Sequence, residues 1–447
     1  MALYGLSAPL STKERMGEKF GKIVSKVKKR IPIPVRNGLR SLYYLLFPEK
    51  KNKVTWGEDQ SESRNKKIYE NVIQKFHHLF SPREIRNDDI SSMRHLLSKK
   101  YKGIVIYPPT VNWRFPLFQR PHQIFRVLAE KGFLCFFCVP HPEQEGVEGL
   151  KEVQENLFLC GKVPLLHTFL QDEEVIIWAT WTPHKVFHEY FPNGRLIYDF
   201  IDELNVFQGF SASMEEDHRT LLQRADLVLT TAATLWEKAK ETREDAILIP
   251  NGAYLHDFEV TTPPSPPKDL TRILENGKPI IGYYGALSEW FDYELINDVA
   301  RTCKGYNIVL IGPNYDGSIR DLLRADNLFW LGGKEYPELK NYLYFFGVAI
   351  IPFKVNRITH STSPIKLFEY MAGGKPIVVT DLKECRKYKS VYIAKDKEDF
   401  ISKIAMAWER RNDPQYIRLL KREAEENSWH SRVEVVIEEL SKKLQRR

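Results

Sequence analysis

The sequence predicts an α/β protein made of two consecutive, doubly wound domains. The chain has 447 residues, too many for one compact core. Short apolar runs without alternation recur along it, which is typical of strands covered on both faces. A proline-rich segment, TTPPSPPKDL at 261–270, separates these runs into two groups and is expected to link the two domains.

The first group of strands is expected between residues 103 and 250. Amphipathic stretches lie between the runs, so the strands are predicted to be parallel and joined by helices. The runs are GIVIY (103–107), FLCFFCV (133–139), EVIIWA (174–179), RLIYDF (195–200), DLVLTT (226–231) and AILIP (246–250).

The second group restarts the same alternation after the linker. Its runs are PIIGYYG (279–285), YNIVLIG (306–312), NLFWLGG (327–333), VAIIPF (348–353), PIVVT (376–380) and VYIA (391–394). We place the two domains at 99–260 and 275–425, with a last helix at 426–447. Because ligands of such sheets bind beyond the carboxyl ends of the strands, the cleft between the domains is the expected active site.

Residues 1–98 are expected to form a basic, mostly helical extension. Residues 12–53 carry 13 Lys or Arg against three Glu, whereas the whole chain has a formal charge of +8. In RMGEKFGKIVSKVKKRI (15–31) apolar residues recur at helical spacing between lysines, which suits an anionic membrane surface contacted through residues 13–53. An ordinary solvated helix explains the same pattern. Nucleic acid is not expected as a partner, because the rest of the chain carries no matching basic face.

Composition favours a cytoplasmic protein, at most peripheral to the inner face of the membrane. No apolar run approaches the ~20 residues of a membrane span. The N-terminus does not have the pattern of a secretory signal. Five cysteines fit a reduced compartment better than a disulfide framework. Cys135 and Cys138 form a CxxC inside an expected buried strand. No His/Cys cluster or DxD-type site is placed to bind a metal, so neither metal nor cofactor is expected.

The stretch HSTSPIKLFEYMAGGKPIVV (360–379) predicts an anion site. A helix is expected to begin near Ser363-Pro364 and to turn its positive end toward the cleft. Lys366 lies in the first turn and could reach a diphosphate, while Glu369 on the same face could accept both ribose hydroxyls of a nucleotide. A surface Lys–Glu pair is the structural alternative. Gly282 and Gly285, after the first strand of this domain, would let the backbone approach the bound group.

The first domain should supply polar groups at its own strand ends. An Asp that caps the next helix is the alternative at Asp199 and Asp202, and a structural role is the alternative for each histidine. The catalytic candidates are His122, Asp199 and Asp202. The candidates for acceptor binding are Trp113, Arg114, Arg120 and His184. The aromatic side chains of WATWTPH (178–184), which ends another strand, could stack on a sugar face.

PIKLFEYMAGGKPIVV resembles the donor-site signature of the GT-B glycosyltransferases in the large retaining group called family 4 or group 1. Other segments agree: ADLVLTTAATL with ILIPNGAYLHDF resembles that family's end of the first domain, and ENSWHSRVEVVIEEL (426–440) its closing helix. FQRPHQIFRVLAEKG (118–132) and YDFIDELNVF (198–207) are similar to bacterial members of the teichuronic-acid type, which build cell-surface polysaccharides. The likeness covers roughly residues 100–445.

The resemblance implies a GT-B fold and transfer of a sugar from a nucleotide-diphosphate donor to a glycan or lipid-linked acceptor, with retention and without a metal. Two features depart from the family pattern. Position 361 is Ser where a sugar-facing Glu is common, so Ser361, Thr362 and Ser363 are expected to bind the sugar. The usual Arg and Lys after the first glycine turn of the second domain are missing, so Arg357 and Lys366 are expected to hold the diphosphate.

Two other functions are compatible with the same motifs. One is another enzyme of this shape, such as a nucleotide-sugar epimerase or a phosphorylase. The other is a non-catalytic partner in glycan assembly that has kept the fold, which Ser361 and the missing cation pair would favour.

Overall fold

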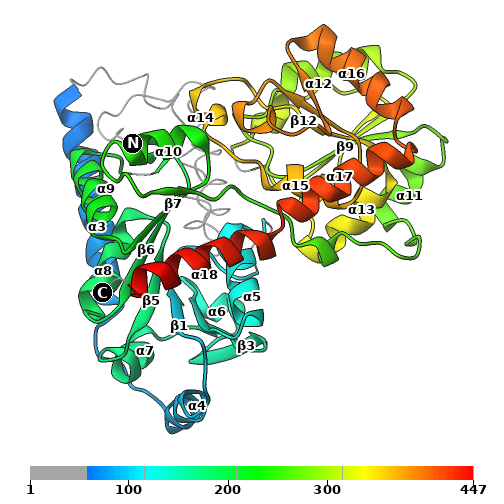
Figure 1. Ribbon diagram of the computed structural model, residues 1–447. Coiled ribbons are helices and arrows are strands. Elements are labelled where there is room, and N and C mark those ends of the chain that lie inside the picture. Colours follow the sequence, from blue (N-terminus) through cyan, green and yellow to red (C-terminus); the bar gives the residue numbers. More distant parts are fainter. Residues whose placement is uncertain (1–57, 115–116, 208, 315, 446–447) are drawn as a thin grey trace, which may run out of the picture.

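The computed structural model describes residues 58–114, 117–207, 209–314 and 316–445. The basic segment 13–53, with its expected membrane contact, lies outside these residues. The described residues form two α/β lobes that face each other, with helices on both sides of each sheet (Figure 1). Each of the strands predicted from the sequence is present.

The sheet of the first domain has the order β3-β4-β2-β1-β5-β6-β7-β8 and is parallel apart from β3, which runs antiparallel to β4. Its central strands are fully buried because helices cover both faces. The hairpin β3–β4 was not foreseen, since β3 is half exposed and carries no continuous apolar run. The strands are β1 (Ile104–Tyr107), β2 (Leu134–Cys138), β3 (Leu150–Gln154), β4 (Leu157–Cys160), β5 (Val175–Ala179), β6 (Arg195–Phe200), β7 (Leu227–Thr230) and β8 (Ile247–Leu248).

The sheet of the second domain is parallel throughout, with the order β11-β10-β9-β12-β13-β14. In both sheets the chain starts in the middle and winds outward in two directions, so each has a switch in strand order at its centre. The strands are β9 (Ile280–Tyr284), β10 (Asn307–Ile311), β11 (Leu328–Trp330), β12 (Phe346–Ile351), β13 (Ile377–Thr380) and β14 (Val391–Ala394).

The helices between the strands follow local signals in the sequence. Asp292 caps α12 by accepting a hydrogen bond from the backbone of Leu295, and Asp413 with Pro414 begins α17 in the same way. The helices are α5 (Arg120–Glu130), α6 (Pro142–Glu145), α7 (Val163–Leu170), α8 (Lys185–Tyr190), α9 (Ala212–Arg224), α10 (Ala233–Lys240), α11 (Lys268–Leu274), α12 (Tyr293–Thr302), α13 (Leu339–Phe345), α14 (Arg357–His360), α15 (Ile365–Ala372), α16 (Lys397–Glu409), α17 (Pro414–Glu426) and α18 (Trp429–Gln445).

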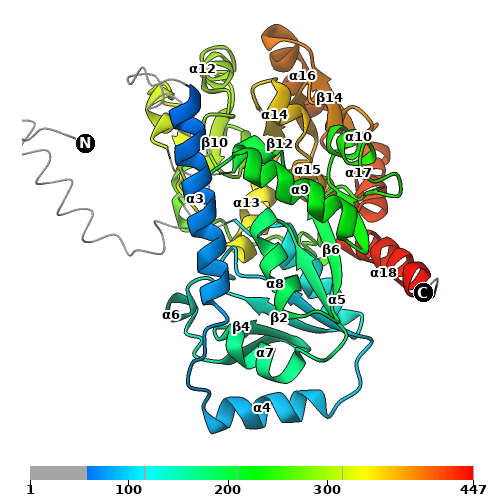
Figure 2. The same ribbon diagram turned by 90° about the vertical axis from the view of Figure 1, so that its left-hand side faces the viewer.

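Two further helices precede the first strand and pack on the first domain. They are α3 (Glu58–His78), which runs along α8 and α9, and α4 (Asn87–Leu97), which lies beside α7 (Figure 2). Phe76, Phe80 and Met93 are buried in the hydrophobic cluster on that face of the sheet. Residues 58–98, assigned to the extension from the sequence, therefore complete the first domain.

The chain passes between the domains twice, and the two passages are hydrogen-bonded to each other. Ala253 donates its backbone N–H to Asn427 and accepts one from Trp429. Helix α18 then lies across the first domain, where Trp429, Val433 and Val436 join the cluster beneath α5 (Figure 1). The last helix of the chain thus ties the second domain back to the first.

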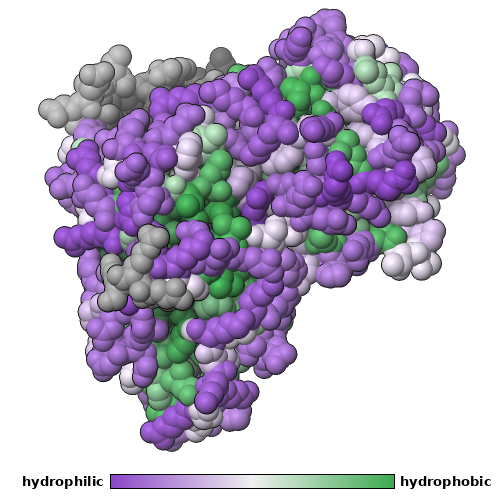
Figure 3. All heavy atoms as spheres, viewed as in Figure 1, coloured by the Kyte–Doolittle hydropathy of each residue, from purple (hydrophilic) through white to green (hydrophobic). Residues whose placement is uncertain are grey.

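Most of the face seen in Figure 3 is hydrophilic, and hydrophobic side chains show mainly in a furrow of the first domain beside α18. Five large hydrophobic side chains are exposed among the described residues: Trp330, Val355, Ile358, Met406 and Val435. No helix in the described part of the chain is both long and apolar enough to span a membrane.

Candidate active site

A cleft of about 380 Å³ lies between the domains, at the carboxyl ends of β1, β5 and β6 on one side and of β9 and β10 on the other. Its lining includes seven of the residues predicted from the sequence: Arg120, Asp202, Gly285, Thr362, Ser363, Lys366 and Glu369. The cleft is where the strand order predicts a ligand site. Most of the remaining lining is aromatic or aliphatic.

Helix α15 brings Lys366 and Glu369 to this cleft. The helix begins after Pro364, whose backbone is extended, so the free N–H groups of its first turn lie at the cleft. Lys366 Nζ lies 4.9 Å from the centre of the Phe353 ring, and burial lowers the pKa of this ammonium to about 8. Burial raises the pKa of Glu369 to about 7, an effect only partly offset by Tyr284 and Lys366.

The glycine turn after β9 makes room for Lys366. Gly285 has φ +139°, and a Cβ there would meet Lys366 Cε at 2.5 Å and the hydroxyl of Tyr283 at 2.8 Å. Any larger residue would push the lysine out of the cleft. Gly282 has a different role from the predicted one: it lies inside β9, where a Cβ would collide with the ring of Phe346 at about 2.2 Å. It serves packing and does not line the cleft.

In the described part of the chain, Lys366 is the cleft cation without an ion-pair partner. Three cations line it among the described residues, and the other two are neutralised: Arg120 by Asp199, and Lys334 by Asp269 at 2.8 Å. The prediction that Arg357 shares the diphosphate is not supported, because its side chain is 76% exposed, outside the cleft and 4.0 Å from Glu203. An anion entering the cleft would therefore meet Lys366 and the first turn of α15.

The loop before α15 is joined to the first domain. Asn251 Nδ2 donates to the carbonyl of Ser363 at 2.7 Å, and Ser361 Oγ donates to Glu203 at 3.0 Å while accepting from Thr234 at 2.9 Å. Ser361 is buried and does not line the cleft. Its expected contact with the sugar is therefore replaced by a contact between domains, whereas Thr362 and Ser363 remain on the cleft wall.

His122 is a helix cap and not a group that touches substrate. Its Nδ1 accepts from the backbone of Gln119 at 3.1 Å, and its Nε2–H donates to the carbonyl of Asn112 at 3.0 Å. The ring is fully buried, and burial lowers its pKa to about 4, so it is neutral at physiological pH. Both nitrogens are used, which removes His122 from the catalytic candidates.

Asp199 lies near the end of β6 and Asp202 lies just beyond it, and the two aspartates have different roles. Asp199 is fully buried and accepts two hydrogen bonds from the Arg120 guanidinium, at 2.7 and 3.0 Å, and one from the Trp178 indole at 3.1 Å. It fixes Arg120 at the cleft floor and does not reach the cleft itself. Asp202 lines the cleft, is partly exposed, and its side chain has no hydrogen-bond or ion-pair partner among the described residues. Burial, and then the charge of Glu203, raises its pKa to about 7.

The remaining candidates for acceptor binding do not line the cleft. Trp113 packs edge-on against Phe118 and Phe137, and the side chain of Arg114 is exposed outside the cleft. His184 is fully buried; its Nδ1 accepts from the backbone of Thr180, so its Nε2–H donates to Thr110 Oγ1 at 2.7 Å. His184 therefore positions Thr110, which does line the cleft.

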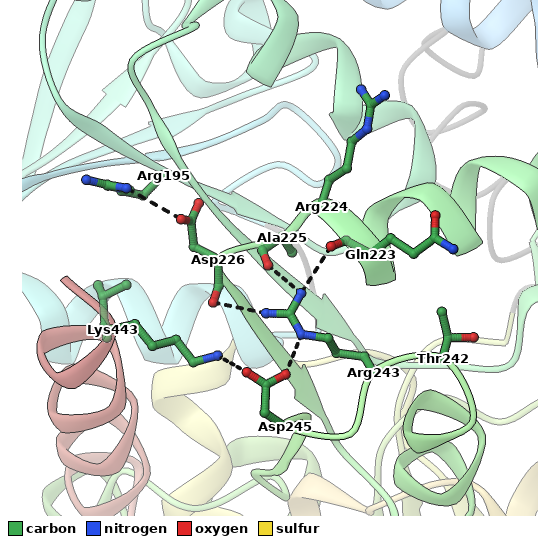
Figure 4. Close-up of a pocket in the computed structure, with 10 residues that line it drawn as sticks. Arg195, Gln223, Arg224, Ala225, Asp226, Thr242, Arg243, Asp245 and Lys443 are labelled. Atoms are coloured by element: carbon green, nitrogen blue, oxygen red, sulfur yellow. Dashed lines mark hydrogen bonds and ion pairs between the residues drawn. The ribbon is translucent and has the colours of Figure 1, made fainter. Parts of the chain in front are cut away.

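A second hollow, of about 530 Å³, lies at the amino ends of β6 and β7, at the end of the first sheet away from the cleft, and it is polar. Arg243 and Lys443 point toward Asp245, and Arg195 points toward Asp226 (Figure 4). Arg243 also donates to the carbonyl of Ala225 at 2.7 Å. These charges satisfy one another and fasten the end of α18 to the sheet, so the hollow is a structural ion-pair cluster.

Several cleft residues were not foreseen from the sequence. Phe207, Tyr284 and Lys334 all line it. Phe207 directly follows the short turn 204–206 beyond β6, and an aromatic residue just beyond a strand was the available signal. Trp181 also lines the cleft and is one of the aromatic residues of 178–184 for which stacking on a sugar was expected. Lys334 gave no signal of its own, because only the folded sheet brings the loop after β11 to the cleft.

Comparisons with known proteins agree with this geometry. Residues 278–410 match the family model described as "Glycosyl transferases group 1". The catalytic domain of starch synthase IV from Arabidopsis thaliana, bound to ADP and acarbose, superposes with a TM-score of 0.59 at 12% identity. The match covers 78% of this chain and 100% of that one. The described residues of this chain have the GT-B fold, and its second domain matches the group 1 glycosyl transferases.

Two more proteins are similar to this chain. The putative teichuronic acid biosynthesis glycosyltransferase TuaH of Bacillus subtilis is 23% identical over 279 residues, which is 58% of this chain and 70% of the relative. The Anabaena protein HepE in complex with UDP-glucose has a TM-score of 0.51 at 14% identity, covering 76% of this chain and 99% of that one. The segment matched by the family model contains the predicted residues of the second domain that line the cleft: Gly285, Thr362, Ser363, Lys366 and Glu369.

Proposed function

We propose that this protein transfers a sugar from a nucleoside diphosphate donor to a glycan or lipid-linked acceptor in the synthesis of a cell-surface polysaccharide. The observation that carries the proposal is Lys366, which lies at the start of α15, three residues before Glu369, and is the unpaired cation among the described residues that line the cleft. That arrangement suits a diphosphate at the helix N-terminus and a ribose beside the carboxylate. The printed names of TuaH and HepE favour a surface glycan as product and UDP-glucose as a first donor to test.

The proposed chemistry uses the charge on the leaving diphosphate. As the bond between C1 of the sugar and the phosphate oxygen breaks, negative charge grows on the diphosphate and is met by Lys366 and the N–H groups of α15. The acceptor hydroxyl forms the new C1–O bond on the face from which the diphosphate departs, and its proton passes to a departing phosphate oxygen. The anomeric configuration is then retained. In this scheme the chain's own groups stabilise the leaving group without a metal.

The donor is identified by thermal shift. A ligand that binds only the native state raises the melting temperature, so the full chain is heated with UDP-, GDP-, ADP- and dTDP-sugars, with and without EDTA. One nucleotide class is expected to raise the melting temperature in the wild type but not in Lys366→Ala. Lys354→Ala, an exposed lysine of the same domain outside the cleft, should keep the full shift. No shift with any nucleotide sugar would contradict the proposal, and a shift lost in EDTA would contradict metal independence.

Stereochemistry and reaction type are read from the products. With the identified donor and a suitable acceptor, proton NMR of the new linkage is expected to show the anomeric configuration of the donor. The opposite configuration would refute retention. Release of free sugar or of an epimer in place of a glycoside would refute transfer and favour an epimerase.

We also propose that residues 13–53 hold the protein at an anionic membrane surface. Their net positive charge and apolar spacing are suited to phosphatidylserine- or phosphatidylglycerol-containing vesicles. Deleting residues 1–57 leaves every described residue in place and should abolish sedimentation with such vesicles. Equal sedimentation of both forms would refute the membrane contact.

A further inference from the structure

The first-domain wall of the cleft has an aromatic surface. Trp181 follows β5 and Phe207 follows a short turn beyond β6, and both line the cleft. Their rings lie nearly parallel, with centres 6.1 Å apart and an angle of 22° between the planes. The strands β5 and β6 are parallel neighbours, and the cleft that this surface lines is also lined by residues 362–364, in the loop before α15 of the second domain. Aromatic walls with a few fixed polar groups are typical of small-ligand sites.

Two polar groups on this wall have no protein partner in the described part of the chain. The buried indole N–H of Trp181 makes no hydrogen bond. The carboxylate of Asp202, which follows β6 directly, makes neither a hydrogen bond nor an ion pair and remains partly exposed in the cleft. Buried polar groups in native proteins are almost always satisfied, so unpartnered ones in a ligand cleft indicate a polar ligand. A donor and an acceptor on one wall of the cleft suit the hydroxyl groups of a sugar.

A third polar group on the wall is held in a fixed orientation. Thr110 Oγ1 accepts from His184 Nε2 at 2.7 Å and donates to the carbonyl of Pro108 at 3.1 Å. One lone pair of this oxygen is left for a ligand. The buried His184 cannot be reached from the cleft and serves to orient Thr110.

The charge of the wall narrows the class of ligand. Arg120, the cation of the first domain that lines the cleft, is bound to Asp199, and Lys366 stands on the donor side. A second anion beside Asp202 would therefore have a like-charged neighbour and, among the described residues, no free cation on this wall. Burial raises the pKa of Asp202 to about 7, so this repulsion is fully developed slightly above neutral pH.

We infer that Thr110, Trp181, Asp202 and Phe207 form the acceptor subsite, and that it takes a neutral sugar unit and rejects uronic acids and phosphorylated sugars. The inference rests on the proposed transfer reaction and specifies its acceptor. Trp181 and Phe207 cover the apolar face of the sugar ring, while Asp202, Thr110 and the indole N–H bind its hydroxyls.

The test measures the binding of three matched probes to the full chain saturated with UDP at about pH 8. The probes are the p-nitrophenyl glycosides of glucose, N-acetylglucosamine and glucuronic acid, and saturation-transfer NMR titration gives their dissociation constants. The two neutral glycosides should bind at least about tenfold more tightly than the glucuronide, as expected for one uncompensated like-charge contact. Asp202→Asn removes the negative charge with little change of shape and should reduce the preference to about twofold or less.

Two further variants separate the charge of Asp202 from other effects on binding. Asp326→Asn removes an exposed carboxylate outside the cleft and should keep the tenfold preference. Trp181→Phe keeps an aromatic ring but loses the N–H, and should weaken all three glycosides severalfold without changing their order. Asp202 has no protein partner, and its raised pKa lowers the stability of the folded state at pH 8, so Asp202→Asn should melt at or above the wild type and a lost preference cannot be attributed to unfolding.

The subsite is refuted if the glucuronide binds the wild type as well as the neutral glycosides, if none of the three binds, or if Asp202→Asn leaves the preference unchanged. The donor thermal shift of the same wild-type preparation separates this failure from failure of the proposed function. A normal shift with any of these results overturns the acceptor subsite alone. An absent shift overturns the transferase proposal itself.

Discussion

The hydroxyl of Ser361 in the second domain donates a 3.0 Å hydrogen bond to the carboxylate of Glu203 in the first domain. Position 361 lacks the glutamate that is common at that place in similar glycosyltransferases. In the folded protein a carboxylate is nevertheless present there, contributed by the other domain. Lys238 neutralises it, and the cluster joins the donor loop to α10.

This contact should couple donor binding to domain closure. Removing either partner loses a hydrogen bond to a charged group, worth about 1.5–3 kcal/mol. Ser361→Ala and Glu203→Gln should each weaken donor binding by roughly tenfold in calorimetry. In the double variant the two losses should not add, because both act on one interaction. Additive losses would show that the two residues act independently.

Lys366 should carry most of the electrostatic affinity for the donor diphosphate. Lys366→Ala is expected to weaken the binding of UDP or the identified nucleotide by 10- to 100-fold, in the range of ~1.5–3 kcal/mol for a charged hydrogen bond. Lys354→Ala is the matched control. Equal affinities of wild type and Lys366→Ala by calorimetry would place the diphosphate elsewhere.

The pH dependence of donor binding should be bell-shaped. Glu369 accepts hydrogen bonds from ribose hydroxyls only when ionised, so affinity should rise as pH increases through about 7. Lys366 holds phosphate only as an ammonium, so affinity should fall as pH increases through about 8. The profile of kcat/KM against pH reports these groups in the free enzyme. A flat profile between pH 6 and pH 9 would contradict the assignment of both residues.

Glu369 should also lower the stability of the free protein above neutral pH. Its pKa in the folded protein, about 7, exceeds the ordinary value of 4.5, so the folded state retains a proton that the unfolded chain has lost. Stability therefore decreases as pH rises from 4.5 to 7, by up to about 3 kcal/mol. Glu369→Gln should be more stable than the wild type at pH 8 and equal to it near pH 4.5, as measured by urea unfolding. The exposed Glu155→Gln should show no such difference.

The buried pair Arg120–Asp199 should be one of the strongest single contributors to the stability of the first domain. Both side chains are almost completely inaccessible, so Asp199→Ala leaves an unpaired buried guanidinium and is expected to cost about 3–5 kcal/mol. The exposed pair Arg386–Asp381 is the control, and Asp381→Ala should cost no more than about 1 kcal/mol. Similar urea midpoints for the two variants would contradict this difference.

The strands could be predicted because buried parallel strands are continuous apolar runs, a local property of the sequence. The hairpin β3–β4 was missed because β3 is half exposed and lacks such a run. Lys366 and Glu369 were found for a similar reason: the loop, proline, lysine and glutamate follow one another along the chain.

The partners of the site residues could not be read from the sequence, since they are distant in it. Arg120 and Asp199 are 79 positions apart, and Ser361 and Glu203 are 158 apart. The sequence therefore indicated Arg120, Asp199 and His122 as polar residues near a cleft, but not that the first two neutralise each other or that His122 caps a helix. Asp202 lines the cleft without a partner whereas Asp199 is buried against Arg120, and these differences exist only in the folded protein.

The central claim is that Lys366 and Glu369 bind a nucleoside diphosphate in the interdomain cleft. A crystal structure with the bound nucleotide tests this claim most directly. The nucleotide chosen by thermal shift is soaked or co-crystallised with the full chain. The diphosphate should lie within hydrogen-bond distance of Lys366 Nζ and the first turn of α15, with a ribose hydroxyl on Glu369. A nucleotide bound outside the cleft, or one whose diphosphate avoids Lys366, would contradict the account.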